Sequence, residues 1–364
     1  MKITNITITV VDLGDLETPF WNSIVRTTGQ RRARVEIATD EGVVGMAPCS
    51  ASRVRRAIIL GPLKQKLIGE DPLRIGYLWQ RMYMGGTRKP VAKGDTIASI
   101  GAVDNALWDL KGKALNQPVW TLIGGTQRRV KAYAAGGYYA EGKGIPNLVE
   151  EMTGYVDGGF RAVKMKVGWS GVTLRHDAER VRAVREAIGP EIDLMIDANN
   201  AWNAKTALKF ARMVEPYDPY WFEEPVPADD LRGGALLVEA LDMPIASGEN
   251  EFTRWGAREL IEAHAADIIQ LDPTTCGGIS EWLKVAAIAS AYHHPMAPHG
   301  NPNIGSCCVA AVENGLITEN YPTAFKNTLM APVDFREDGT IAMSNAPGLG
   351  ITWNEDVIAR YGMS

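Results

Sequence analysis

Short apolar segments alternate with helical segments from residue 130 to residue 318, and this alternation limits the possible folds more than any other feature. We expect eight strand cores, at Val130–Ala135, Ala162–Val167, Asp193–Asp197, Tyr220–Glu223, Ile245–Ser247, Ile268–Leu271, His294–Ala297 and Leu316–Thr318. Segments with helical periodicity lie between them, such as Lys205–Val214, Arg254–His264 and Glu281–Ala291. Eight strands with intervening helices predict a closed parallel barrel. A doubly wound open sheet is the competing architecture, but no GxGxxG motif follows a strand.

The residues before this alternation have a different pattern. Ile3–Val11 and Arg34–Thr39 alternate apolar and polar side chains and are expected to be strands. The polar stretch Thr18–Gln30 between them is expected to be a loop, and Thr96–Ala114 has the apolar spacing of a helix. The alternation stops after about residue 331, and the turn-rich tail that follows could return to the N-terminal part of the chain.

Composition excludes several classes of partner. The chain has 364 residues and a net charge of −5, without a long basic block, so we expect no nucleic-acid partner. No segment approaches the ~20 apolar residues that span a bilayer, so no membrane association is expected. The four cysteines form no CxxC pair, which favours a reducing, cytoplasmic location.

Ionisable residues end successive expected strands of the barrel, where functional groups of such barrels lie. They are Lys164 and Lys166, then Asp197, Glu223, Glu249 and Asp272, with His299 and Glu319 after the next two strands. Several acids at one barrel end are costly unless positive charge lies among them.

Three of these acids are evenly spaced, since 223 − 197 and 249 − 223 both equal 26. One strand–helix unit separates each from the next, so the carboxylates of Asp197, Glu223 and Glu249 should converge. Three hard oxygen ligands suit Mg²⁺. Any one of the acids alone could instead be a helix cap or a surface residue.

The lysines and the histidine supply candidate acid–base groups. Lys164 and Lys166 lie on one face of their strand, because side chains alternate with period two. Two crowded ammonium groups with a metal nearby should lower the pKa of one, which would make it a base near neutral pH, although KxK also occurs on surface strands. Asp272 and His299 form a second candidate pair, in which the carboxylate would fix the imidazole tautomer.

The motifs together resemble the enolase superfamily, in particular its mandelate racemase-like branch. The resemblance covers nearly the whole chain and rests on RAVKMKVG, MIDANNAW, WFEEP, SGEN, LDPTTCGG, PHG and TENY, in this order. It implies a (β/α)₇β TIM-type barrel with an α+β capping domain built from the N-terminal segment and the tail. The expected boundaries are 1–123 for the capping domain, 124–330 for the barrel and 331–364 for the returning tail.

The resemblance also implies a role for each candidate residue. Lys166 would be the lysine base, and Lys164 would tune its pKa and contact the substrate carboxylate. Asp197, Glu223 and Glu249 would bind Mg²⁺, and His299 with Asp272 would act on the opposite face of the substrate. Glu319 would hydrogen-bond the substrate carboxylate as it becomes an ene-diolate, and Asn199 would touch a substrate hydroxyl.

Within that branch, VKAYAAGGYYAEGK and PHGNPNIGS are similar to D-tartrate dehydratases, which favours dehydration of an acid sugar, an aldonate or aldarate. Lys89 matches a basic position of those sequences and is expected to bind the far end of the substrate, as is the loop around Trp21. A homo-oligomer is expected.

The expected reaction is Mg²⁺-assisted removal of the proton next to the carboxylate, followed by loss of water to a 2-keto-3-deoxy acid. A racemase or epimerase of a 2-hydroxy acid, and a cycloisomerase of a sugar-acid lactone, remain open alternatives, because they use the same lysine and histidine. A metal-binding or structural barrel without catalysis is a further alternative.

Overall fold

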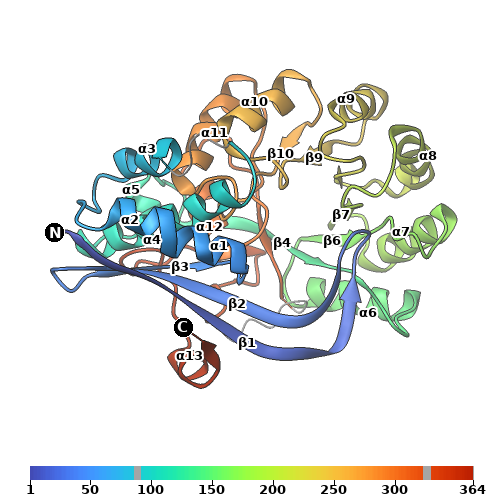
Figure 1. Cartoon of the computed structure of the whole chain (residues 1–364). Helices are drawn as coiled ribbons and strands as arrows, with labels where there is room; N and C mark the ends of the chain where they lie inside the picture. The colour runs from blue at the N-terminus through green and yellow to red at the C-terminus, as the bar shows by residue number, and fades with distance from the viewer. Residues whose placement is uncertain (86–91, 323–328, 364) are drawn as a thin grey trace.

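The computed structural model describes residues 1–85, 92–322 and 329–363. Its N-terminal sheet is antiparallel, with strand order β13-β1-β2-β3. The strands are β1 (Ile3–Trp21), β2 (Arg26–Thr39), β3 (Val44–Cys49) and β13 (Gly362–Met363). The prediction of a loop at Thr18–Gln30 is wrong. β1 and β2 continue through this stretch as a long two-stranded ribbon, which reaches from the cap to the barrel (Figure 1).

Helices cover one side of this sheet. They are α1 (Arg53–Ile58), the π-helix η1 (Ile59–Leu63), α2 (Lys64–Leu67), α3 (Ile75–Gly85), α4 (Asp95–Ala114) and α5 (Val119–Leu122). The expected helix at Thr96–Ala114 is thus present as α4, and most of its residues are buried. Gly45 lets β3 approach this helix closely, because a Cβ there would lie 2.2 Å from the carbonyl oxygen of Ala106.

Parallel strands form the second sheet and close into a barrel. They are β4 (Arg129–Gly136), β6 (Ala162–Lys166), β7 (Asp193–Asp197), β8 (Trp221–Glu223), β9 (Ile245–Ser247), β10 (Ile268–Ile269) and β11 (Thr318–Asn320). Met296 bridges Ile269 to Gly315, and β11 pairs with β4, which completes the ring. The seventh strand is reduced to this bridge, because prolines at 295 and 298 flank it and cannot donate to a ladder.

One helix follows each of the first seven strand positions. These helices are α6 (Ile145–Asp157), α7 (Leu174–Ile188), α8 (Ala204–Val214), α9 (Leu231–Ala240), α10 (Thr253–Glu262), α11 (Ile279–Ala291) and α12 (Pro302–Ala310). The short 3₁₀ helix η2 (Glu215–Tyr217) follows α8, and β5 (Tyr139–Ala140) pairs with the end of β1. The predicted fold class, a (β/α)₇β barrel with an α+β cap, is confirmed.

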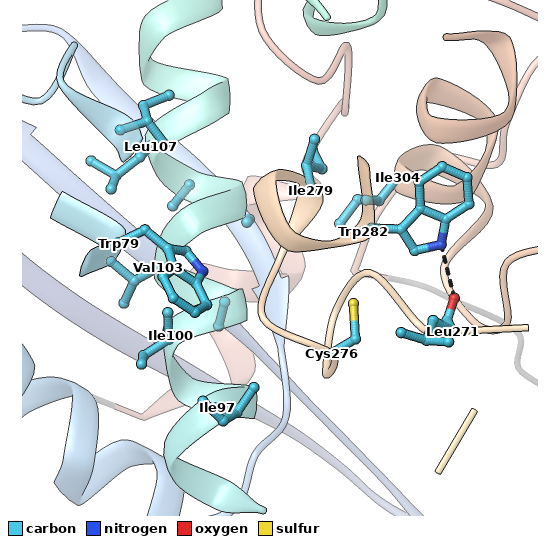
Figure 2. Close-up of a cluster of buried hydrophobic side chains, with 14 of the residues drawn as sticks. Trp79, Ile97, Ile100, Val103, Leu107, Leu271, Cys276, Ile279, Trp282 and Ile304 are labelled. Atoms are coloured by element: carbon cyan, nitrogen blue, oxygen red, sulfur yellow. Dashed lines mark hydrogen bonds between the residues drawn. The ribbon is translucent and has the colours of Figure 1, made fainter. Parts of the chain in front are cut away.

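Side chains fill the barrel interior below its polar end. Nearly every strand contributes one or two apolar residues to this layer, namely Tyr133, Ala135, Ala162, Met195, Trp221, Ala246, Ile268, Ala297 and Ile317. A larger core joins the cap to the barrel. There α4 packs against Leu271, Cys276 and Trp282 of the barrel, as Figure 2 shows.

The tail contacts both parts of the molecule. β12 (Thr340–Ala342) pairs with β4 of the barrel, whereas β13 pairs with β1 of the cap, and α13 (Glu355–Tyr361) lies between them in the chain. The domain boundaries at residues 123 and 330 stay predictions. Among the described residues, no helix is both long and apolar enough to cross a bilayer.

Candidate active site at the carboxyl end of the barrel

Both lysines of β6 point into the barrel and form ion pairs with carboxylates of other strands. The Lys164 ammonium lies 2.6 Å from Glu223 Oε1, 2.9 Å from Glu319 Oε1 and 3.7 Å from Asp197 Oδ2. Lys166 also forms an ion pair with Asp197 Oδ2. All these side chains are at least nine-tenths buried, so little solvent screens their charges.

These ion pairs determine the direction in which the pKa of each lysine departs from its ordinary value. Burial lowers the pKa of Lys164 and of Lys166, but the facing carboxylates outweigh burial and raise both values above the ordinary value. The expected lowering of one lysine pKa refers to a site with a metal nearby, and it stays a prediction. Burial and the neighbouring Asp197 raise the pKa of Glu223 to about 8, whereas Lys166 and Lys164 overcome burial and lower the pKa of Asp197.

His299 follows the seventh strand position and faces three carboxylates. Its Nδ1 lies 3.2 Å from Asp272 Oδ2, while its Nε2 lies 3.3 Å from Glu249 Oε2 and 3.8 Å from Glu319 Oε2. Asp272 is fixed in turn, since Oδ1 accepts hydrogen bonds from the backbone and hydroxyl of Thr274 at 2.6 and 2.7 Å. Burial lowers the pKa of His299, but Glu249 and Glu319 outweigh it and raise the pKa well above its usual value.

Glu319 connects the two acid–base groups. One carboxylate oxygen pairs with Lys164, and the other accepts a hydrogen bond of 2.8 Å from the backbone of Gly300, next to His299. Burial raises the pKa of Glu319, but Lys164 and His299 overcome this effect and lower it to about 2. The structure thus brings together all five predicted catalytic side chains.

The three predicted metal ligands end adjacent strands, but their carboxylates face cations of the chain. Asp197 and Glu223 contact the lysines, and Glu249 is turned toward His299. In the part of the chain that the structure describes, no three His, Cys, Asp or Glu side chains stand ready to enclose an ion. The donor set still suits a hard cation, because the three carboxylates lie at or just after the carboxyl ends of three adjacent strands. Asn199 adds a buried side-chain oxygen that has no partner among the described residues.

A buried ion pair holds the segment that follows Lys166. Arg180 on α7 donates 2.8 and 3.0 Å hydrogen bonds to the carbonyls of Lys166 and Gly137, and it pairs with Asp177 at 2.9 Å. Asp177 also accepts a 2.8 Å hydrogen bond from the backbone of Gly168. Arg180 and Asp177 therefore hold the backbone at and just after the carboxyl end of β6 in place.

The β1–β2 ribbon covers the mouth of the barrel near the lysines. The hydroxyl of Ser23 hydrogen-bonds to the carbonyls of Ala198 and Asn199 at 2.7 and 2.8 Å. Trp21 is 9 % exposed and packs edge-on against Trp169, three residues after Lys166. Its indole nitrogen is buried without a partner among the described residues. Lys89, the other predicted distal contact, lies outside the described residues.

Family models divide the chain into two matched segments. Residues 5–124 match the mandelate racemase/muconate lactonizing enzyme N-terminal domain, and residues 147–357 match an enolase C-terminal domain-like model. The chain belongs to the mandelate racemase/muconate lactonizing enzyme family. The first matched segment covers the N-terminal sheet and its helices, and the second covers most of the barrel and the tail.

Relatives within this family have different named reactions. Arabinonate dehydratase of Saccharolobus solfataricus is 37 % identical, with 90 % of this chain and 89 % of the relative covered. D-galactarolactone cycloisomerase of Agrobacterium fabrum is 29 % identical, with coverage of 100 % and 99 %. The crystal structure of a racemase from Streptomyces coelicolor A3(2) with bound magnesium superimposes with a TM-score of 0.90, at 29 % identity and coverage of 99 % and 100 %.

Four polar residues of the site in this family member were not predicted. The hydroxyl oxygen of Tyr133 accepts a 3.2 Å hydrogen bond from Lys164, and Gln270 donates a 2.9 Å hydrogen bond to Glu223. The hydroxyl of Tyr321 lies 3.4 Å from His299 Nε2, and the ring of Tyr138 lies 5.3 Å from the Lys166 ammonium. Gln270 and Tyr321 could have been found, since each lies two residues from a predicted catalytic acid and so on the same strand face.

Proposed function

We propose that this protein is a Mg²⁺-dependent acid-sugar dehydratase that converts a 2,3-dihydroxy acid to a 2-keto-3-deoxy acid. The observation that carries the proposal is the convergence of a lysine and a histidine–aspartate pair, from different barrel strands, on a mouth with three acids. The dehydratase name of the 37 % identical relative supports the choice of reaction.

Each group of the site has a part in this reaction. Lys166 would take the proton next to the substrate carboxylate, which requires its ion pair with Asp197 to open, because an ammonium group cannot accept a proton. His299 would protonate the departing 3-hydroxyl, which leaves as water. The enol that remains then tautomerises to the keto acid.

Other residues would bind and orient the substrate. Lys164 and Glu319, which form an ion pair, would contact its carboxylate, and the unpartnered oxygen of Asn199 would accept from a hydroxyl. Trp21 and Lys89 remain proposed contacts for the distal end. Asp197, Glu223 and Glu249 would hold Mg²⁺, which supplies positive charge that stabilises the ene-diolate.

A cycloisomerase of a sugar-acid lactone is the second candidate, because the relative whose length this chain matches almost completely has that name. Proton transfer by the same lysine and histidine would serve it. The product separates the candidates, since a dehydratase forms water and a 2-keto-3-deoxy acid, whereas a cycloisomerase consumes a lactone without loss of water.

The proposal is tested by incubating the purified protein with a panel of aldonates and aldarates and Mg²⁺, and by measuring 2-keto-3-deoxy acids. We expect at least one acid to react and exhaustive chelation to abolish the reaction. Asp197→Asn, Glu223→Gln and Glu249→Gln should each lower kcat/KM by roughly 100-fold or more, whereas Glu191→Gln, an exposed acid at the opposite barrel end, should retain activity. Turnover that survives chelation would reject the metal assignment. Epimer formation without any keto acid would favour a racemase instead.

A further inference from the structure

A single carboxylate cross-links the three strand ends that carry the proposed metal ligands. Glu224 directly follows Glu223 on β8. Its Oε2 accepts a 2.6 Å hydrogen bond from Asn200 after β7, and its Oε1 accepts a 2.7 Å hydrogen bond from Asn250 after β9. Asn250 directly follows Glu249. Each of the three cross-linked residues therefore lies one to three positions after one of the three acids.

Glu224 is not placed as a ligand itself. It is 1 % exposed, and each carboxylate oxygen is already engaged by a side-chain amide. Successive side chains of a strand point to opposite faces, so Glu224 lies behind the strand ends while Glu223 points into the barrel. Its side-chain hydrogen-bond partners are the two asparagines.

The backbone around this cross-link is held in an uncommon conformation. Asn199, Asn200 and Glu224 have φ angles of 41°, 64° and 40°, in the left-handed region. Such residues cost on the order of 1–3 kcal/mol each and persist only where surrounding contacts fix them. Here the backbone of Asn200 also donates a 2.8 Å hydrogen bond to the carbonyl of Glu224, which joins the two loops a second time.

We infer that Glu224 is a positioning residue, which sets the spacing of Asp197, Glu223 and Glu249 for a divalent cation. The inference rests on the proposed function. Mg²⁺ demands near-ideal octahedral geometry, so the distances between its ligands must be fixed before it binds. Residues that orient ligands from behind typically change metal affinity by about 10–100-fold when they are replaced.

The test uses the full chain with Mg²⁺ alone and measures Kd by isothermal titration calorimetry. Glu224→Gln places an amide nitrogen against one of the two asparagine amides, so one hydrogen bond is lost. We expect Kd for Mg²⁺ to rise about 10–100-fold. Asn250→Asp sets two carboxylates face to face and should also weaken binding.

The double variant Glu224→Gln/Asn250→Asp exchanges the amide and the carboxylate. The oxygen of the introduced glutamine could still accept from Asn200 while its nitrogen donates to the introduced aspartate, so both cross-links return at the same net charge. We expect its Kd to return close to the wild-type value. A residue that only stabilised the fold would not show such recovery of Kd. Glu281→Gln is the matched control: this acid is equally buried and hydrogen-bonded, but to Arg254 of α10. The Glu281→Gln variant should have a lower thermal stability than the wild type and an unchanged Kd for Mg²⁺.

An unchanged Kd in Glu224→Gln, or no recovery in the double variant, would overturn the inference, as would a wild-type protein that does not bind Mg²⁺. If Glu224→Gln fails to fold, Asn200→Ala and Asn250→Ala each remove one cross-link and decide the matter: a raised Kd supports the inference and an unchanged Kd rejects it. Mg²⁺ binding that responds to these variants, in a protein that dehydrates no acid sugar, would reject the proposed function and leave the inference intact.

Discussion

Neighbouring carboxylates raise the pKa of both Lys166 and His299. Asp197 outweighs burial at the lysine, and Glu249 with Glu319 outweighs it at the histidine. Whichever of the two groups acts as the base must first release its proton. Which one does so determines the face from which the substrate proton is removed.

We expect Lys166 to be the base and His299 the acid for the leaving hydroxyl. Lys166→Ala should then abolish both deuterium exchange at the α-carbon and product formation, because no group remains to take the proton. His299→Asn should stop dehydration and retain slow exchange in D₂O, which NMR can follow. If exchange is lost in His299→Asn and kept in Lys166→Ala, the two roles are exchanged.

Residue types and strand-face periodicity were enough to predict which charged side chains gather at the carboxyl end of the barrel. The period of two placed Lys164 and Lys166 on one face, and the 26-residue spacing placed three acids on adjacent strands. The direction of the lysine pKa could not be predicted in this way. It depends on which carboxylate lies within about 4 Å of each ammonium, and such distances follow only from the packed barrel.

At the scale of elements, side chains of helix α7 hold the carboxyl end of β6 in position. Arg180 reaches from the helix to the carbonyl of Lys166, and Asp177 binds the backbone of Gly168 two residues later. The guanidinium also lies 4.0 Å above the ring of Tyr139, whose strand pairs with the cap ribbon. A helix outside the barrel thus links the lysine strand to the cap.

Arg180→Lys should lower kcat by roughly 10–100-fold with a smaller change in KM, because an ammonium keeps the charge beside Asp177 but cannot reach both carbonyls. Steady-state kinetics on the acid sugar that the screen identifies would measure this. Arg182→Lys, on the same helix but exposed and paired with Glu186, is the control and should behave like wild type. Equal kinetics for the two variants would contradict a positioning role for Arg180.

The β1–β2 ribbon shows where sequence patterns fail at this scale. A strand is usually predicted from one apolar face that is buried, but residues 12–20 of β1 are all at least partly exposed. The ribbon is held by its own ladder and by contacts such as Ser23 with the end of β7. Such contacts join residues about 175 positions apart and leave no local signal.

At the scale of the whole molecule, one buried acid joins the cap to the barrel. Asp104 on α4 accepts a 2.9 Å hydrogen bond from the backbone of Ser280, at the start of α11. Its other oxygen is buried without a partner among the described residues. Burial raises the pKa of Asp104 to about 7, although the Ser280 hydrogen bond and Lys284 oppose this shift and Glu281 adds to it.

Stability should therefore depend on pH through this acid. The folded protein keeps the Asp104 proton up to about pH 7, whereas the unfolded chain releases it near pH 4, so the free energy of unfolding falls as pH rises through this range. Asp104→Asn keeps the acceptor for Ser280 and removes the titration. Its stability relative to wild type should increase from about pH 5.5 to pH 8, by up to a few kcal/mol. Urea unfolding at several pH values measures this difference, and a constant difference would contradict the assignment.

The barrel as a whole followed from its alternation of strands and helices, but its joint with the cap did not. The helical spacing of Ile97, Ile100 and Val103 indicates a buried face without naming its partner. That partner proves to be the region around Cys276 and Trp282, far along the chain (Figure 2). Packing between such distant segments is specified by shape, which single-sequence periodicity does not contain.

The lysines that pair with the barrel carboxylates have a consequence for the life of the enzyme in a cell. Because Lys164 and Lys166 supply positive charge beside Asp197, Glu223 and Glu319, burial of these acids costs less free energy than burial of unpaired carboxylates. We therefore expect a scarcity of magnesium to silence the enzyme without exposing it to proteolysis. When magnesium becomes available again, the folded enzyme molecules would regain activity without new protein synthesis.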